Sequence, residues 1–340
     1  MLTDLEILRV DPHDADLYDA WHAAYAAAER ADRGDDAPVW TLEESRTELQ
    51  QQSQQYERRA FVARRDGAVV AAGKLGLPLT DNTHRAGLGV YVPPEFRRQR
   101  IASTLLAELE RQAVAAGRTT AVAEASWSYD LGPDGSGSAG REFAGRHGYA
   151  LAIGDVMRRL ELPVSTQVLD RLAALAAERH AGYTIRAWSG QVPEDVVAGW
   201  AVLDASLETE APVGDLELEP STPDVAAVRE QEALFVDQHR TSYGTVALDP
   251  AGEVVAYTQL VVSADDGRAY QWGTLVRAAD RGHRLGMAVK IANLRQLQSH
   301  QSAAAVITYN ADSNSYMNAV NEQLGFVPVE RMGEFQKKLG

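Results

Sequence analysis

Apolar residues follow the same order twice along the chain. In the first half, short apolar runs at residues 61–63 and 69–70 lie on either side of Gly67. The second half repeats this arrangement around Gly252. A glycine between two short apolar runs is typical of a hairpin that joins two antiparallel strands. Each half therefore predicts a sheet that begins with antiparallel strands.

The two halves also share later landmarks at a nearly constant spacing. When Val92 is placed on Val276, Arg97 falls on Arg281 at an offset of 184 residues, and the helices that follow stay in step. Further on, Gly148 corresponds to Gly325 at an offset of 177. Self-similarity of this kind indicates an internal duplication.

Each copy predicts a strand, a helical region, three antiparallel strands, a helix, a strand, a helix and a last strand. The fold class is therefore α+β, with two tandem domains that each hold a mixed, mostly antiparallel sheet flanked by helices. Residues 166–180 have apolar positions at helical spacing and predict a connecting helix. We expect an N-terminal domain over 1–163, the connector over 164–181 and a C-terminal domain over 182–340.

Composition narrows the function classes. The chain has 340 residues, a net charge of −15 and no cysteine, which excludes disulfides and thiolate metal sites. The acidic balance argues against a nucleic-acid partner. No apolar run approaches the length of a membrane span, and the first residues lack the pattern of a signal peptide. We expect a cytoplasmic protein without a metal ion.

A glycine- and arginine-rich turn separates an apolar strand from a helix in the second copy. The strand ends at Leu275-Val276, the turn is Arg281-Gly282-His283-Arg284, and the helix opens with Leu285-Gly286-Met287. Such a turn directs unpaired backbone N–H groups and the positive end of a helix dipole at one point, which favours phosphate. The first copy has Val92 and then Arg97-Arg98-Gln99-Arg100-Ile101-Ala102 in the same place.

These motifs resemble those of the GNAT superfamily of acyl-CoA-dependent N-acyltransferases. The family's phosphate loop has the form Gln/Arg-x-x-Gly-x-Gly/Ala, and both copies keep its first and last positions. Its later motif, which ends in Leu-Gly-Phe, matches Asn314 through Phe326. The layout is similar to tandem members of the family, such as those of the mycothiol synthase kind. The resemblance implies acetyl-CoA as cosubstrate.

The same resemblance implies roles for individual residues. Leu275 and Val276 would pair with the pantetheine arm, and a backbone N–H there would polarise the thioester carbonyl. The loop from Arg281 to Met287 would hold the pyrophosphate, with His283 either touching the coenzyme or lying on the surface. Asn310 and Asn314 would contact the coenzyme.

The first copy departs further from the family pattern, and we expect it to be degenerate. At the same offset, Ala125 and Ser126 stand where the second copy has Tyr309 and Asn310. Its arginine-rich loop could bind the coenzyme without turnover, or this half could be purely structural. The second copy is the one expected to be catalytic.

The acid and base are harder to assign. The family often uses a tyrosine four residues before the glycine of Leu-Gly-Phe to protonate the departing thiolate, but Asn321 and Ala144 occupy that position here. Tyr309 is the substitute candidate, with Tyr316 behind it, and a packing role for Tyr309 stays open. The candidate bases lie within or directly before an acidic segment over 209–223, which forms either a lid or a solvated loop. They are Glu208, Glu210 and Asp215.

The favoured function is an N-acetyltransferase that moves an acetyl group directly from acetyl-CoA to the amine of a small molecule. Two alternatives stay open: a non-catalytic acyl-CoA-binding or sensor protein, and a peptide or protein N-acetyltransferase. The expected partner is a small-molecule amine, with no nucleic acid and no membrane, and the chain is expected to be a monomer or a homodimer.

Overall fold

The computed structural model describes residues 5–31, 33, 37–300 and 303–340. The chain divides into two compact units. Unit 1 consists of residues 1–153 and 332–340, and unit 2 of residues 154–331.

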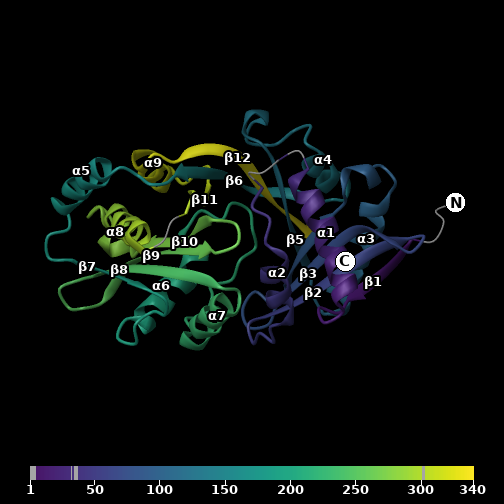
Figure 1. Cartoon of the computed structure of the whole chain (residues 1–340), viewed down its shortest axis with the longest axis horizontal. Coiled ribbons are helices and arrows are strands. Elements are labelled where there is room, and N and C mark those ends of the chain that lie inside the picture. Colours follow the sequence, from purple (N-terminus) through teal and green to yellow (C-terminus); the bar gives the residue numbers. More distant parts are fainter. Residues whose placement is uncertain (1–4, 32, 34–36, 301–302) are drawn as a thin grey trace. The chain divides into compact units, whose positions relative to one another are not determined.

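Unit 1 holds one sheet with helices on both of its faces (Figure 1). Its strands lie in the order β1-β2-β3-β4-β5-β12. Helices α3 and α4 pack on one face, and α1 and α2 on the other. The elements of the unit are β1 (Glu6–Val10), α1 (Ala15–Arg30), α2 (Leu42–Gln50), β2 (Tyr56–Arg65), β3 (Ala68–Pro78), β4 (Arg85–Tyr91), η2 (Pro94–Phe96), α3 (Ile101–Ala115), β5 (Thr120–Ser128), η3 (Tyr129–Leu131), α4 (Ala139–Arg146) and the start of β6 (Ala150–Glu161).

Unit 2 repeats this plan, with strands in the order β6-β11-β10-β9-β8-β7. Helices α5, α8 and α9 pack on one face of its sheet, and α6 and α7 on the other (Figure 1). Its elements are α5 (Thr166–Ala177), β7 (Thr184–Ser189), α6 (Val197–Glu210), α7 (Val225–Asp237), β8 (Arg240–Leu248), β9 (Val254–Ser263), β10 (Arg268–Val276), η4 (Ala278–Asp280), α8 (Leu285–His300), β11 (Ala305–Ala311), α9 (Ser315–Leu324) and β12 (Val327–Lys338).

The predicted fold class is confirmed, since both copies have the expected order of strands and helices. In each sheet one adjacent pair is parallel, β4 with β5 and β10 with β11. The boundaries of the two compact units differ from the boundaries expected for the duplicated segments. It falls inside β6 and again inside β12, so the end of the chain belongs to unit 1. The boundaries at residues 163 and 181 stay predictions about the duplication.

Local sequence explains where most helices begin. Asp14, Ser138 and Ser165 cap α1, α4 and α5 by accepting a backbone N–H of the first turn. Thr41 and Glu44 form a full capping box on α2. Helix α3 differs, because no side chain caps its first turn. Its N–H groups therefore stay available to a ligand.

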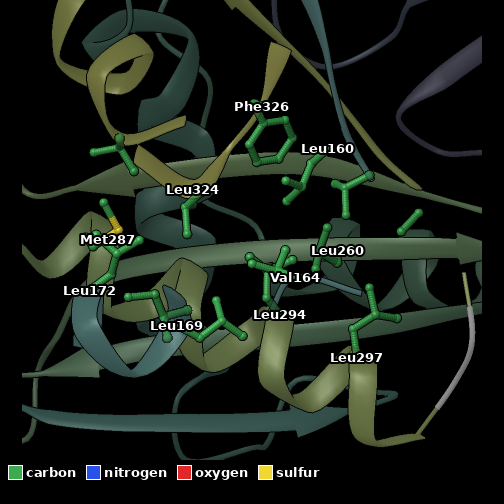
Figure 2. Close-up of a cluster of buried hydrophobic side chains, with 14 of the residues drawn as sticks. Leu160, Val164, Leu169, Leu172, Leu260, Met287, Leu294, Leu297, Leu324 and Phe326 are labelled. Carbon is green, nitrogen blue, oxygen red and sulfur yellow. The ribbon is translucent and has the colours of Figure 1, made fainter. Parts of the chain in front are cut away.

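The main core of unit 2 lies between the sheet and the helices α5, α8 and α9. Figure 2 shows Leu172 of α5 beside Met287 of α8, and the strand residue Leu260 near Leu294 of α8; all four belong to one buried cluster. Burying one such side chain contributes about 1.5–3 kcal/mol. The segment expected to be a connector is therefore an integral part of the unit 2 core.

Candidate functional site

An opening between two strands lies at the centre of unit 2. Strands β10 and β11 run parallel, and they pair from Arg268 and Ala305 to Tyr270 and Ile307. Within the described chain this pairing goes no further, although β10 continues to Val276 and β11 continues along β6. An extended ligand can add hydrogen bonds to strand backbone that is left open in this way.

A β-bulge bends β10 beside this opening. The register of β10 against β9 shifts between Gln271 and Thr274. A bulge leaves an extra residue out of the ladder and redirects the strand. The equivalent strand of unit 1, β4, pairs with β3 from Gly87 to Tyr91 without a shift. In unit 1 the parallel pairing of β4 with β5 also stops part-way, at Gly87 and Val122. The bulge therefore distinguishes the opening of unit 2 from that of unit 1.

The bulge contains a glycine for a steric reason. A Cβ atom on Gly273 would lie 2.0 Å from the hydroxyl oxygen of Tyr257. The same hydroxyl donates a hydrogen bond to Oδ1 of Asp204, with an O–O distance of 2.9 Å. The bare backbone of Gly273 thus allows a tyrosine–aspartate pair to sit against the bend in β10.

The predicted phosphate loop of unit 2 joins β10 to α8. After the short helix η4, Nε of Arg281 donates to the carbonyl of Val276 at 3.3 Å and closes the turn. Gly282 and Arg284 have positive φ values of 89° and 55°. A positive φ is easily adopted by glycine but costs free energy for any other residue, here Arg284. It brings the chain directly into α8, whose first N–H groups have no helical partner.

Unit 1 builds the same loop from a different sequence. Nε of Arg97 donates to the carbonyl of Val92 at 3.1 Å. Arg98 and Arg100 have φ values of 62° and 64°, so arginine adopts the left-handed conformation here without a glycine. Gln99 is held by Arg65, and Ile101 opens the uncapped helix α3. Two strained arginines in one loop point to a functional constraint.

The charged side chains of the unit 2 loop already have protein partners. The guanidinium of Arg281 pairs with Glu210, at the end of α6. Nη1 of Arg284 donates to the carbonyl of Leu175 at 2.8 Å, and Nδ1 of His283 lies 3.0 Å from the carbonyl of Arg179. Arg284 and His283 therefore tie the loop to the end of α5, while Arg281 holds a carboxylate.

A cavity of about 150 Å³ lies between α5, α8 and α9. Arg284 and Tyr316 contribute polar groups to its wall, and the rest of the lining is mostly apolar. Tyr316 lies beside the first turn of α8, since a Cβ on Gly286 would be 3.9 Å from its ring. Burial raises the pKa of the Tyr316 hydroxyl, and Arg284 and Arg281 lower it in part. The cavity therefore adjoins the phosphate loop.

Other predicted contact residues lie on two faces of the sheet. Leu275 and Val276 end β10, and both are buried. Tyr309 of β11 faces the α7 side, where its hydroxyl contacts Sδ of Met157 at 3.0 Å. Asn314 caps α9, because its Oδ1 accepts the N–H of Met317 at 3.2 Å. The side chain of Asn314 thus has a structural role at the start of α9, and the Tyr309 hydroxyl is directed at Met157.

The structure places a carboxylate at the bulge that the sequence reasoning missed. Asp204 of α6 is exposed, yet the loss of water around its carboxylate raises its pKa, an effect that the hydrogen bond from Tyr257 offsets in part. The candidates Glu208 and Asp215 are exposed on α6 and on the segment that follows. The sequence contained one signal for Asp204. It lies one helical turn after Trp200, which is buried, so both residues are on the face of α6 that packs on the sheet.

A buried polar chain runs on the α8 side of the opening. Nζ of Lys290 donates to Oδ1 of Asn321 at 2.9 Å, and Nδ2 of Asn321 donates to Oδ1 of Asn310 at 2.6 Å. Asn321 occupies the position where the family places a tyrosine. The sequence signal for Lys290 was a single charge between apolar residues of one helix face, Met287 and Leu294.

The constant offset misaligns β5 with β11 by one residue. Ala125 packs on the α3 side of its sheet, whereas Tyr309 lies on the α7 side of its own. Side chains alternate between the faces of a strand, so Ala125 corresponds to Asn310 and Glu124 to Tyr309. Glu124 is exposed, and desolvation together with Glu334 raises its pKa to about 7. Unit 1 therefore also has a carboxylate beside its opening.

Comparison with known proteins assigns the family. Residues 17–127 match the model of the acetyltransferase (GNAT) family. The structure of a tandem GNAT protein from the clavulanic acid biosynthesis pathway aligns with 99% of this chain and 99% of its own, at 26% identity and a TM-score of 0.78. Residues 17–127 therefore form a GNAT-family domain, and the chain as a whole has the fold of a tandem GNAT protein.

A further tandem-length match shares the GNAT fold. The GCN5-related N-acetyltransferase from Sphaerobacter thermophilus aligns over 98% of this chain and 96% of its own, with 16% identity and a TM-score of 0.66. No curated protein gives a significant sequence match. The GNAT fold supports acyl-CoA-dependent acetyl transfer in general. The family match falls in unit 1, the copy that the sequence reasoning regarded as degenerate.

Two kinds of feature are absent from the part of the chain that the structure describes. Among the residues that the structure describes, no group of three or more His, Cys, Asp or Glu side chains could hold a metal ion. In the same part of the chain, no helix combines the length and the apolar character needed to cross a bilayer.

Proposed function

We propose that unit 2 transfers an acetyl group from acetyl-CoA to the amine of a small molecule. The opening between β10 and β11, with the bulge at Gly273 on one side and a phosphate-type loop at its end, carries this proposal. The acyl arm would lie along the open backbone of β10, and the loop before α8 would hold the pyrophosphate.

The residues at the bulge suit the chemistry of amide formation. A backbone N–H released by the bulge would hydrogen-bond the thioester carbonyl as negative charge develops on its oxygen. Asp204 would accept the proton that the attacking ammonium must lose, since its raised pKa brings it closer to neutral. Tyr257 would hold that carboxylate in place.

Two features support a small, cationic acceptor. The net charge of −15 favours the approach of an amine. Helix α6 extends through Glu210, and residues 211–224 then run without helix or strand before α7. This segment follows directly on the helix that carries Asp204, so it would restrict the acceptor site to small molecules.

Direct attack suits this chain because it has no cysteine to carry an acetyl group. An acetylated form of the protein should therefore be absent after incubation with acetyl-CoA alone. Intact-protein mass spectrometry checks this, and a mass increase of one acetyl group that disappears on adding the amine would contradict direct transfer.

The test of the proposal is release of free thiol from acetyl-CoA in the presence of amino acids, polyamines and amino sugars, with a lysine-rich peptide as the alternative acceptor. We expect turnover with at least one small amine. Asp204→Asn should lower kcat by about 10²–10³-fold, as for the loss of a general base, whereas Asp237→Asn on exposed α7 should not. Binding without turnover would favour a sensor.

The same assay separates the candidate bases. Glu208→Gln and Asp215→Asn should retain activity if Asp204 is the base. A loss of activity in one of these two variants, with Asp204→Asn unaffected, would assign the base to Glu208 or to Asp215 instead. The acidic limb of the kcat/KM profile should lie above the ordinary range of an aspartate and should vanish in Asp204→Asn.

A further inference from the structure

Lys290 is an unusual residue to find at the centre of a core. It lies on α8, its side chain is 1% exposed, and its Nζ is 5.4 Å from the centre of the Phe326 ring. Enclosing an amine in this way costs free energy unless it has a partner. Its Nζ donates to the side-chain oxygen of Asn321, at 2.9 Å.

The hydrogen bonds of this chain have a fixed direction. An ammonium group can only donate, so Asn321 must turn its Oδ1 toward Lys290 and its Nδ2 away. That Nδ2 donates to Oδ1 of Asn310 at 2.6 Å. The Nδ2 group of Asn310 is then left as a donor. Lys290 thus sets the orientation of two amides in succession.

The end of this chain lies at the proposed acyl site. Asn310 is on β11 beyond Ile307, where the parallel pairing with β10 has ended, and it remains bound to β6 on the other side. Continuing the register along both strands brings Asn310 opposite the bulge around Gly273. Its free amide donor therefore borders the opening.

Unit 1 shows that the fold does not require this network. The positions of Lys290, Asn321 and Asn310 are occupied there by Leu106, Ala144 and Ala125. All three contribute to the apolar core of unit 1. The same architecture is therefore stable with an apolar set, and the polar set in unit 2 has another purpose.

We infer that Lys290 is a positioning residue, which acts through Asn321 to point the Asn310 amide N–H at the sulfur of the acyl thioester. The inference rests on the proposed function. The amine nitrogen forms the new C–N bond as the C–S bond breaks, and the electron pair of that bond leaves on sulfur. The ammonium loses one proton to Asp204 before the attack, and the second N–H proton leaves to solvent as the amide forms. Asn310 only hydrogen-bonds the thiolate, which solvent then protonates.

The surroundings of Lys290 support a role that changes near neutral pH. Burial alone lowers the pKa of Lys290 to about 7. The group that faces it from α9 is the neutral Asn321, and Phe326 follows that helix. No charged group of the described α5, α9 or underlying strands adds to the shift. Once deprotonated, the amine can also accept, and the amide orientation is no longer fixed.

The experiment compares full-length wild type with Lys290→Met and with the triple variant Lys290→Leu/Asn321→Ala/Asn310→Ala, which copies unit 1. Both are assayed for acetyl-CoA turnover, and acetyl-CoA binding is measured by calorimetry. We expect the triple variant to fold, to bind acetyl-CoA within about threefold of wild type, and to lose at least tenfold in kcat with little change in KM. Wild-type kcat should show an inflection near neutral pH that Lys290→Met lacks.

Each outcome has a definite meaning. Unchanged kcat in the triple variant, or the same inflection in Lys290→Met, would overturn the inference and leave the proposed function intact. A lack of turnover by wild type with every amine, despite binding, would overturn the proposed function and this inference with it. If Lys290→Met fails to fold, the triple variant decides, because unit 1 shows that its residues pack in this architecture.

Discussion

Arg281 and Glu210 form an ion pair at the phosphate loop of unit 2. The carboxylate of Glu210 lies at the same guanidinium that would bind a coenzyme phosphate. A carboxylate and a phosphate offer similar acceptor oxygens to an arginine, so the two compete for it. If the coenzyme phosphate binds Arg281 as proposed, it would replace Glu210 as the partner of that guanidinium and would release the end of α6.

Arg281→Ala should weaken acetyl-CoA binding to unit 2 by about 1.5–3 kcal/mol, because a charged hydrogen bond to phosphate is lost. Calorimetric titration measures both the affinity and the number of sites. Arg97→Ala is the matched control, since Arg97 makes the same backbone contact in unit 1. A single site that responds only to Arg97→Ala would mean that unit 1 is the coenzyme-binding half.

Glu210→Gln should strengthen acetyl-CoA binding slightly, because it removes the competing charge. The pair is partly exposed, and such pairs contribute about 0–1 kcal/mol, so the gain should not exceed about fivefold. Glu253→Gln, on an exposed turn of the same unit, should leave the dissociation constant unchanged. Weaker binding in Glu210→Gln would show that Glu210 supports the loop.

Gly273→Ala should abolish activity while the unit stays folded. The new Cβ would lie 2.0 Å from the Tyr257 hydroxyl oxygen, so the tyrosine must move and release Asp204. Gly286→Ala is the matched control, since a Cβ there meets Val276 at an ordinary 3.6 Å and unit 1 has Ala102 in that place. Turnover assays with circular dichroism separate the two, and an active Gly273→Ala would refute the role of the bulge.

Glu124→Gln should flatten the pH dependence of the stability of unit 1. The folded state raises the pKa of Glu124 to about 7, from an ordinary value near 4.5, so it holds a proton that the unfolded chain has lost. Stability should fall as pH rises from 4.5 to 7. The loss should be about 1 kcal/mol because the residue is exposed and solvent screens it.

Thermal midpoints measured at pH 5 and pH 8 test this. The wild type should lose more stability over that range than Glu124→Gln does. Glu142→Gln, on exposed α4, should behave as wild type. An identical pH dependence in Glu124→Gln and wild type would mean that the carboxyl titrates as it does in water.

The strand, turn and helix start at each predicted phosphate loop could be read from the sequence because their signals are local. A strand, an arginine-rich turn and a helix start follow one another within a few residues. The hydrogen bond from the Arg281 side chain to the Val276 carbonyl likewise joins residues that are close in sequence. The catalytic candidates were not predictable in the same way. Tyr309 is the candidate acid from the sequence because it lies near the end of a strand. Successive side chains of β11 point to opposite faces of the sheet, so Tyr309 lies on the face opposite to Asn310. A constant offset between copies could not show that change of face.

The sequence by itself determined the duplication, the α+β class and the position of the two turns at which we expect phosphate to bind. These follow from apolar periodicity and from turn residues, which act on neighbours along the chain. Only the tertiary structure decided that Asp204 meets Tyr257 at the bulge and that Lys290 reaches Asn310 through Asn321. It also decided that the last strand is divided, so that β12 belongs to unit 1 from Met332 onward. Such contacts join residues from separate elements, so they depend on how the elements pack and leave little trace in any local pattern.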